Sequence, residues 1–227
     1  MSCNRCCSVE QQFDRTAAER ALRRYRRRGP DKTTRRLIED LLAALLARGV
    51  HDAVLLDIGA GVGAIHHELL DGAVSRAVHV DASPAQVEVA RAESERRGHG
   101  ARVEFVQADF TTVADDVAVA DIVTLDRVIC CYNDMAGLVS RSAVKAAMFY
   151  GAVYPRQTPW TRLGVSTINL FQRVRRSAFR VFLHHPSLID LALRDAGLER
   201  VSFHQTLGWE IVVYARRAVR GSPTATA

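Results

Sequence analysis

Short continuous runs of apolar residues alternate along this chain with stretches whose apolar residues recur every three or four positions. The continuous runs are typical of buried strands, and the periodic stretches are typical of helices with one apolar face. Strands are expected at residues 54–56, 77–80, 103–106, 122–125, 148–153, 200–206 and 209–215. Because strands and helices alternate regularly, the pattern predicts an α/β fold with a doubly wound, mostly parallel sheet.

The two ends of the chain depart from this alternation. Only Leu207 and Gly208 separate the last two expected strands, and so short a link is typical of an antiparallel hairpin. Two helices are expected before the first strand, over residues 16–28 and 33–48. The first of them is predicted to start at a capping box that begins at Thr16.

This organisation divides the chain into three parts. Residues 1–32 form a basic arm, residues 33–217 form the main domain, and residues 218–227 are a tail that we expect to be disordered. Within the main domain, residues 156–185 are interpreted as an insertion between the fifth and sixth strands.

Composition changes this picture mainly at the N-terminus. At 227 residues and 48% apolar content, the chain can bury a full core. The net charge of +6 arises in residues 1–50, which hold 12 of the 31 Lys and Arg but 6 of the 25 Asp and Glu. Such a patch attracts phosphate, anionic lipid or an acidic substrate, and the alternative is a solvated helix face. The sequence shows neither a transmembrane run nor a signal-peptide core, so a cytoplasmic location is expected.

The five cysteines fall into tight groups, Cys3 with Cys6 and Cys7, and Cys130 with Cys131. An odd number that includes vicinal pairs does not suit a disulfide framework, so reduced thiols and no bound metal are expected. Convergence of both groups on zinc or an iron–sulfur cluster is the alternative.

The segment from Val54 to Gly63 carries the most specific motif of the chain. It reads VLLDIGAGVG, a buried strand that runs into a glycine-rich turn. Gly59, Gly61 and Gly63 allow a tight turn and close approach of the backbone to a ligand. Asp57 precedes them, and a carboxylate there suits a ligand that carries a cation, such as the amino group of an amino acid. This combination resembles motif I of the class I S-adenosylmethionine (SAM) methyltransferases.

The resemblance implies a Rossmann-like, seven-stranded sheet with SAM bound at the carboxyl ends of the strands. In this family, Asp81 would accept hydrogen bonds from the ribose hydroxyls and Asp109 from the exocyclic amine of adenine. Phe110 would pack on the adenine ring, and Asp57 would lie near the amino-acid end. The predicted cofactor residues are Asp57, Gly59, Ala60, Gly61, Gly63, Asp81, Ala82, Ser83, Asp109, Phe110 and Asp126.

Binding of NAD is the competing interpretation, since it also uses a glycine turn and an acid about 20 residues further on. The glycines here run GAGVG, without the late glycine of G-x-G-x-x-G. The dinucleotide fingerprint also has no place for Asp109. The pattern therefore favours SAM.

Candidates for the acceptor site follow the fourth expected strand. The segment DRVICCYND covers residues 126–134, where the family places substrate-facing residues. Asp126, Tyr132 and Asn133 are predicted to shape the acceptor site. His185 or His184, in the insertion, is the predicted general base because histidine titrates near neutral pH, and a solvated or capping histidine is the alternative.

The insertion mixes aromatic and arginine side chains. This mixture suits a hydrophobic acid or contact with anionic membrane lipid, and an ordinary helix packed on the sheet edge is the alternative. Together with DRVICCY and a Tyr-Pro-Arg strand exit, the insertion resembles the Mg-protoporphyrin IX O-methyltransferases. Propionate carboxylates on a flat apolar ring would fit this mixture of arginine and aromatic side chains.

We therefore expect a cytoplasmic class I SAM-dependent methyltransferase that acts on a small, hydrophobic or acidic acceptor. The alternatives are a Mg-protoporphyrin-type carboxylate O-methyltransferase, an RNA methyltransferase recruited by the basic arm, and a non-catalytic SAM-binding partner subunit. The segment after the fourth strand lacks an Asn/Asp-Pro-Pro-aromatic motif, which disfavours methylation of nucleobases. The sequence leaves the methylated atom and the oligomeric state open.

Overall fold

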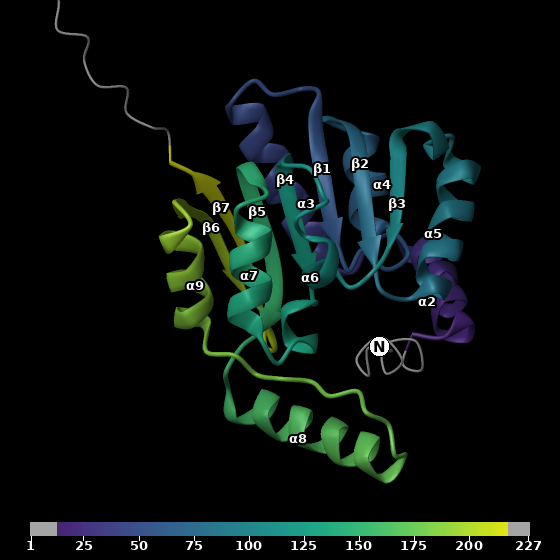
Figure 1. Cartoon of the computed structure of the whole chain (residues 1–227), viewed down its shortest axis with the longest axis vertical. Helices are drawn as coiled ribbons and strands as arrows, with labels where there is room; N and C mark the ends of the chain where they lie inside the picture. The colour runs from purple at the N-terminus through teal and green to yellow at the C-terminus, as the bar shows by residue number, and fades with distance from the viewer. Residues whose placement is uncertain (1–12, 218–227) are drawn as a thin grey trace, which may run out of the picture.

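The computed structural model describes residues 13–217 and shows a seven-stranded sheet between two layers of helices (Figure 1). The strand order is β3-β2-β1-β4-β5-β7-β6. Strands β1 to β5 pair in parallel, and β7 pairs antiparallel with both β5 and β6. The predicted doubly wound sheet with a C-terminal antiparallel hairpin is confirmed.

The strands are β1 (Ala53–Ile58), β2 (Val74–Asp81), β3 (Val103–Gln107), β4 (Ala120–Asp126), β5 (Ala146–Pro155), β6 (Leu198–Gln205) and β7 (Trp209–Arg216). The helices are α2 (Arg15–Arg28), α3 (Lys32–Ala47), α4 (Ala64–Leu70), α5 (Pro84–Arg97), α6 (Phe110–Val113), α7 (Met135–Ala143), α8 (Pro159–Val174) and α9 (Pro186–Asp195), with 3-10 turns η1 (Gly100–Arg102) and η2 (Ile129–Cys131). Strand β2 begins three residues before the predicted strand, because the polar residues Ser75 and Arg76 interrupt its apolar run.

The two faces of the sheet carry separate hydrophobic clusters. Helices α3 and α4 cover one face, and α6, α7 and α9 cover the other. The apolar stripe of α3 is fully buried at Leu37, Leu41 and Leu45, which lie one helical turn apart. Burial of each such leucine contributes about 1.5–3 kcal/mol, so α3 is fixed on strands β5 and β7 of the sheet.

Helix α2 starts one residue earlier than predicted, and the prediction of a capping box at Thr16 is wrong. The N-cap is Asp14, whose Oδ1 accepts a hydrogen bond of 2.8 Å from the backbone N–H of Ala17. A carboxylate caps a helix more strongly than a threonine hydroxyl, so the helix begins at Arg15. Helix α2 then packs on α5, where Arg26 donates to the fully buried Glu93.

No helix within residues 13–217 is long and apolar enough to cross a membrane. The cysteines at positions 3, 6 and 7 and the tail at 218–227 lie outside the described residues.

Candidate cofactor and acceptor site

The glycine turn between β1 and α4 needs glycine for two reasons. Gly59, Gly61 and Gly63 all have positive φ angles, of 63°, 57° and 83°. A Cβ atom on Gly59 would lie 2.4 Å from Cγ2 of Val128. The backbone N–H of Gly59 also donates to the carbonyl of Val80, over 2.7 Å, which fixes the turn against β2. The turn is therefore built so that its backbone, without side chains, forms the floor of a site.

Two cavities meet at this turn and share Gly59, Gly61, Asp126 and Arg127. The first, of about 350 Å³, is called here the apolar cavity. It is lined by Phe13, Ile58, Gly59, Gly61, Val80, Asp81, Ala82, Gln86, Ala108, Phe110, Asp126, Arg127, Val128, Cys131 and Tyr132.

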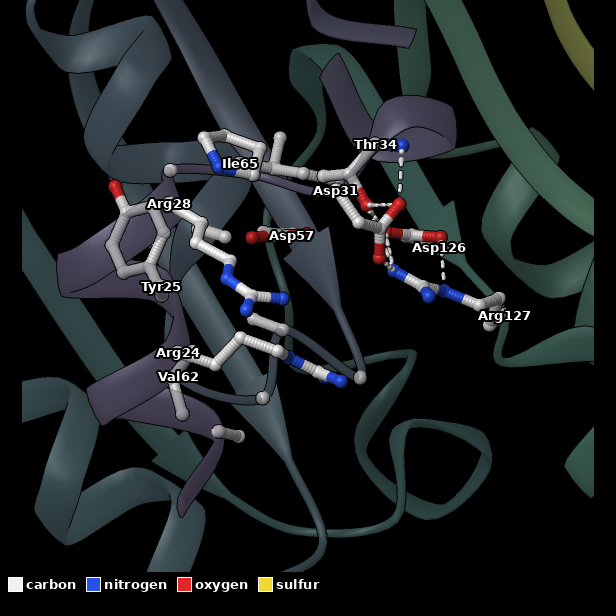
Figure 2. A pocket seen from close by; sticks show the side chains of 17 residues that line it. Arg24, Tyr25, Arg28, Asp31, Thr34, Asp57, Val62, Ile65, Asp126 and Arg127 are labelled. Carbon is white, nitrogen blue, oxygen red and sulfur yellow. Dashed lines mark hydrogen bonds and ion pairs between the residues drawn. The ribbon is translucent and has the colours of Figure 1, made fainter. Parts of the chain in front are cut away.

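The second, of about 430 Å³, is called the arginine cavity and lies between the turn and helices α2 and α3 (Figure 2). It is lined by Ala21, Arg24, Tyr25, Arg28, Gly29, Pro30, Asp31, Thr34, Asp57, Gly59, Ala60, Gly61, Val62, Ala64, Ile65, Asp126 and Arg127. Both cavities therefore open at the carboxyl ends of the parallel strands, where ligands of such sheets bind.

Asp81 places a carboxylate at the wall of the apolar cavity. Its Oδ2 accepts from the N–H of Gly61 over 2.9 Å, and its Oδ1 accepts from the N–H of Ser83 over 2.8 Å. Burial raises the pKa of Asp81 to about 6, although these two N–H groups favour the ionised form. Each oxygen keeps a lone pair, so the carboxylate can accept from two ligand hydroxyls.

Asp57 brings a second buried carboxylate to the arginine cavity. Its Oδ1 accepts from the hydroxyl of Thr124 over 2.8 Å. Among the described residues, its buried Oδ2 has no hydrogen-bond partner, and Nδ1 of His66 lies 3.4 Å away without hydrogen-bond geometry. An unsatisfied buried carboxylate oxygen is costly, so a cationic group of a ligand would be stabilised there.

A network of charged residues links β4 to helix α3 at the junction of the cavities. Arg127 has a positive φ of 61° and donates to Asp126, with its Nη2 2.6 Å from Oδ2 of Asp31 (Figure 2). The hydroxyl of Thr34 donates to Oδ2 of Asp126 over 2.5 Å. Burial opposes ionisation of Asp31, but Arg127 and the hydrogen bonds from Thr33 and Thr34 lower its pKa to about 2. The network holds α3 against the end of β4.

Arg24 and Arg28 of α2 project into the arginine cavity (Figure 2). Neither guanidinium forms an ion pair or side-chain hydrogen bond with any residue in 13–217. Sequence reasoning missed both residues as site residues, because the +6 charge gave no indication of which arginines of the arm face the glycine turn. Two unpaired guanidinium groups make this cavity suited to carboxylate or phosphate.

Three predicted site residues have structural partners. Asp109 caps α6 by accepting from Thr111, and it also accepts from the hydroxyl of Tyr132 over 2.8 Å. Asp109 lines neither cavity, whereas its neighbour Phe110 and Tyr132 line the apolar cavity. Ser83 caps α5, and its hydroxyl donates to the carbonyl of Phe13, which ties the N-terminal segment over the apolar cavity. The predicted contact of Asp109 with adenine stays a prediction.

The structure places the predicted base, His185, away from both cavities. His185 is exposed, caps α9, and shares a hydrogen bond of 2.6 Å with the hydroxyl of Ser187. Its neighbour His184 bonds to the backbone carbonyl of Tyr132. Both histidines thus have the capping or positioning contacts that the alternative interpretation expected.

A cluster of four buried histidines lies behind the glycine turn, at positions 66, 67, 79 and 99. Nδ1 of His67 lies 3.2 Å from Nδ1 of His99, and the ring of His66 packs against those of His67 and His79. Burial, together with the neighbouring charges, lowers the pKa of His67 to about 2. Within residues 13–217, no three metal-binding side chains converge on one point.

Comparison with known proteins identifies the class of this site. Residues 56–143 match the family model described as a methyltransferase domain, and this stretch includes the glycine turn, Asp81 and Asp126. Residues 56–143 therefore belong to a methyltransferase domain, and the fold is that of the class I SAM-dependent methyltransferases. The predicted enzyme class and its cofactor, SAM, are confirmed, and no curated protein matches the chain.

Solved structures share the fold of the methyltransferase domain over most of the chain. The Mg-protoporphyrin IX methyltransferase from Synechocystis PCC 6803 with bound SAH is 20% identical, with a TM-score of 0.71, over 92% of this chain and 98% of that one. An O-methyltransferase family protein from Burkholderia thailandensis is 17% identical, with a TM-score of 0.69, over 93% of this chain and 64% of that one. A putative methyltransferase in complex with the Trm112 activator from Haloferax volcanii is 17% identical, with a TM-score of 0.65, over 92% of this chain and 98% of that one.

The residues of both cavities fit SAM. The unsatisfied Oδ2 of Asp57 suits a cationic part of the molecule, and the buried carboxylate of Asp81 suits a diol. Phe110 and Val128 give the apolar cavity the walls that an adenine ring requires. These assignments of individual residues remain predictions.

Proposed function

We propose that this chain transfers a methyl group from SAM to a carboxylate of a small, largely apolar acid. The observation that carries the proposal is the pair of arginines, Arg24 and Arg28, which form no ion pair within residues 13–217 and line a cavity that shares four residues with the apolar one. SAM supplies an electrophilic methyl group together with a carboxylate of its own. Two guanidinium groups are therefore present for two carboxylates, one on SAM and one on the acceptor.

The side chains around the cavities favour an acceptor that is already ionised at neutral pH. Among the described lining residues there is no histidine. Asp126 lines both cavities but is engaged with Arg127 and Thr34, and burial raises its pKa. Methylation of an alcohol or phenol requires removal of a proton, whereas a carboxylate attacks without one. Positioning alone then suffices for transfer.

The apolar cavity and the aromatic insertion extend the site for a hydrophobic body. Phe13, Val128 and Tyr132 wall the apolar cavity, and Phe179 of the insertion packs edge-on against Phe13 at 5.8 Å between ring centroids. A porphyrin with propionate groups combines these features, and Mg-protoporphyrin IX, the substrate named for one protein of similar fold, is therefore the first acceptor to test.

The experiment is incubation of the enzyme with methyl-labelled SAM and a panel of hydrophobic acids that includes Mg-protoporphyrin IX, with RNA and protein as further acceptors. We expect label in an acid, released as methanol by mild alkali, because carboxyl methyl esters are alkali-labile. Label stable to alkali would contradict the carboxylate assignment, and label only in RNA would favour the nucleic-acid alternative. No labelled acceptor, despite SAM binding, would favour a non-catalytic subunit.

Arginine variants test the observation itself. Arg24→Gln and Arg28→Gln should each raise the KM for SAM or for the acceptor about ten- to a hundredfold, the scale of a lost hydrogen bond to a charged group. Arg20→Gln is the matched control, because Arg20 lies on the same helix and lines neither cavity. Equal, small changes in KM for all three variants would show that α2 contributes no residue to the acceptor site.

A further inference from the structure

Helix α8 packs on the rest of the molecule with its polar side. Its less exposed positions are Thr161, Val165, Asn169 and Gln172, which recur at three- and four-residue spacing and so form one side. The side chain of Asn169 donates to the carbonyl of Val181 and accepts from its N–H, at 2.8 and 2.9 Å. Two hydrogen bonds of Asn169 therefore fix this inner side of α8 to the segment that follows the helix.

The outer side of α8 is apolar and faces solvent. Trp160 is 73% exposed, Leu163 is 64% exposed and Val174 is 74% exposed, with Leu170 and Phe171 between them at 62% and 53%. An amphipathic helix normally turns such a stripe toward the core. A contiguous apolar surface of this kind marks a site of interaction with a partner or a membrane.

The charge around this stripe is of one sign. Residues 135–189 contain no aspartate or glutamate but eight lysines and arginines. Three of the arginines, Arg173, Arg175 and Arg176, lie at the end of α8, and the guanidinium of Arg175 stacks 4.3 Å from the ring of Phe171. A second copy of this helix would bring the same positive charges together without acids to pair them. An anionic surface complements them instead.

The location of α8 relates its outer side to the site. The helix lies beyond the carboxyl ends of the strands, and the segment that follows it runs between α8 and those ends toward α9 (Figure 1). In that segment the N–H of Phe182 donates to the carbonyl of Cys130 over 2.7 Å, and Phe179 packs on Phe13. A surface that holds α8 would therefore lie on the cavity side of the molecule.

We propose that α8 docks this chain on a bilayer that contains anionic lipid. The apolar stripe lies at the boundary between headgroups and acyl chains, and the arginines contact the headgroups, as in interfacial helices. The docking is peripheral, and it does not depend on the identity of the acceptor.

The test is flotation of the full chain with vesicles of phosphatidylcholine, with and without phosphatidylglycerol. We expect binding only to the vesicles with phosphatidylglycerol, weakening as salt is raised. Arg173→Gln, Arg175→Gln and Arg176→Gln together should lower partitioning on the order of a hundredfold, since each basic residue near an anionic surface contributes about fivefold. In Trp209→Phe, where Trp160 is the remaining tryptophan, emission should shift to shorter wavelength on binding.

Matched variants separate α8 from the other exposed surfaces. Leu163→Ser with Phe171→Ser should abolish binding, and Leu46→Ser, at a 61% exposed leucine of α3, should not. Because α2 is also arginine-rich, Arg20→Gln with Arg23→Gln and Arg27→Gln serves as its charge control. Cofactor-induced thermal shifts verify that each variant is folded.

Three results would overturn the proposal. The first is binding that is lost with the α2 variant but not with the α8 variants. The second is absence of binding to either vesicle. The third is a dimer in sedimentation equilibrium that the α8 variants dissociate, which would show that a second copy covers the stripe.

Discussion

The buried histidine cluster predicts a specific loss of stability in mild acid. His79 of β2 is fully buried, and among the described residues neither of its ring nitrogens has a hydrogen-bond partner. It packs between His66 and Phe105. Burial, reinforced by His66 and Arg91, lowers the pKa of His79 well below its ordinary value of 6.5. His79 is therefore neutral in the fold, whereas the unfolded chain takes up a proton below pH 6.5.

The sign and size of the effect follow from proton linkage. A histidine whose pKa is lowered by folding costs stability as pH falls below the unfolded value of 6.5. At 1.36 kcal/mol per pH unit, His79 alone lowers the free energy of unfolding by about 2 kcal/mol between about pH 7.5 and about pH 5. Asp81, whose pKa is raised to about 6, acts in the opposite direction by about 1.4 kcal/mol over the same interval.

A variant isolates the histidine from these other groups. Urea unfolding followed by circular dichroism gives the free energy of unfolding of wild type and His79→Leu. Between about pH 7.5 and about pH 5, this free energy should fall by about 2 kcal/mol less in the variant than in wild type. The exposed His51 provides the control, because the free energy of unfolding of His51→Leu should change with pH as it does in wild type. Equal losses in wild type and His79→Leu would refute the assignment of a neutral, buried His79.

Three further predictions concern the cavities. SAM affinity, measured by calorimetry, should fall about tenfold per pH unit below about pH 6, because Asp81 binds hydroxyls best when ionised; constant affinity down to about pH 5 would contradict this. Gly59→Ala should lower the free energy of unfolding by about 1–3 kcal/mol in urea melts, and adding Val128→Ala should restore part of it. Arg127→Ala should lower the free energy of unfolding by about 1–3 kcal/mol through loss of its partly exposed contacts to Asp126 and Asp31, whereas an unchanged urea melt would show that the network is dispensable.

The sheet could be predicted from the sequence because its signals are local. Each buried strand is a short apolar run, and Asp57, Asp81 and Asp126 mark three of the strand ends. The hairpin followed from the link at Leu207 and Gly208. A helix in the insertion was the alternative interpretation of its sequence, but the sequence could not show that Asn169 would face inward and Trp160 outward.

The site could be predicted only in part, because half of it depends on packing between distant segments. Arg24 and Arg28 reach the arginine cavity because α2 is held by Arg26 on Glu93 and by Tyr25 on Glu68. Neither contact has a signal in the sequence. His185 was predicted as a base from its ordinary pKa, but its position at the start of α9 makes it a cap.

Calorimetric titration with SAM and SAH tests the central claim most directly. We predict one site per chain for wild type, and an affinity about ten- to a hundredfold lower for Asp81→Asn with an unchanged circular dichroism spectrum, the scale of one charged hydrogen bond. Absence of heat with folded wild-type protein for both compounds, or equal affinity in Asp81→Asn, would contradict the claim that the ends of β1, β2 and β4 form a SAM site.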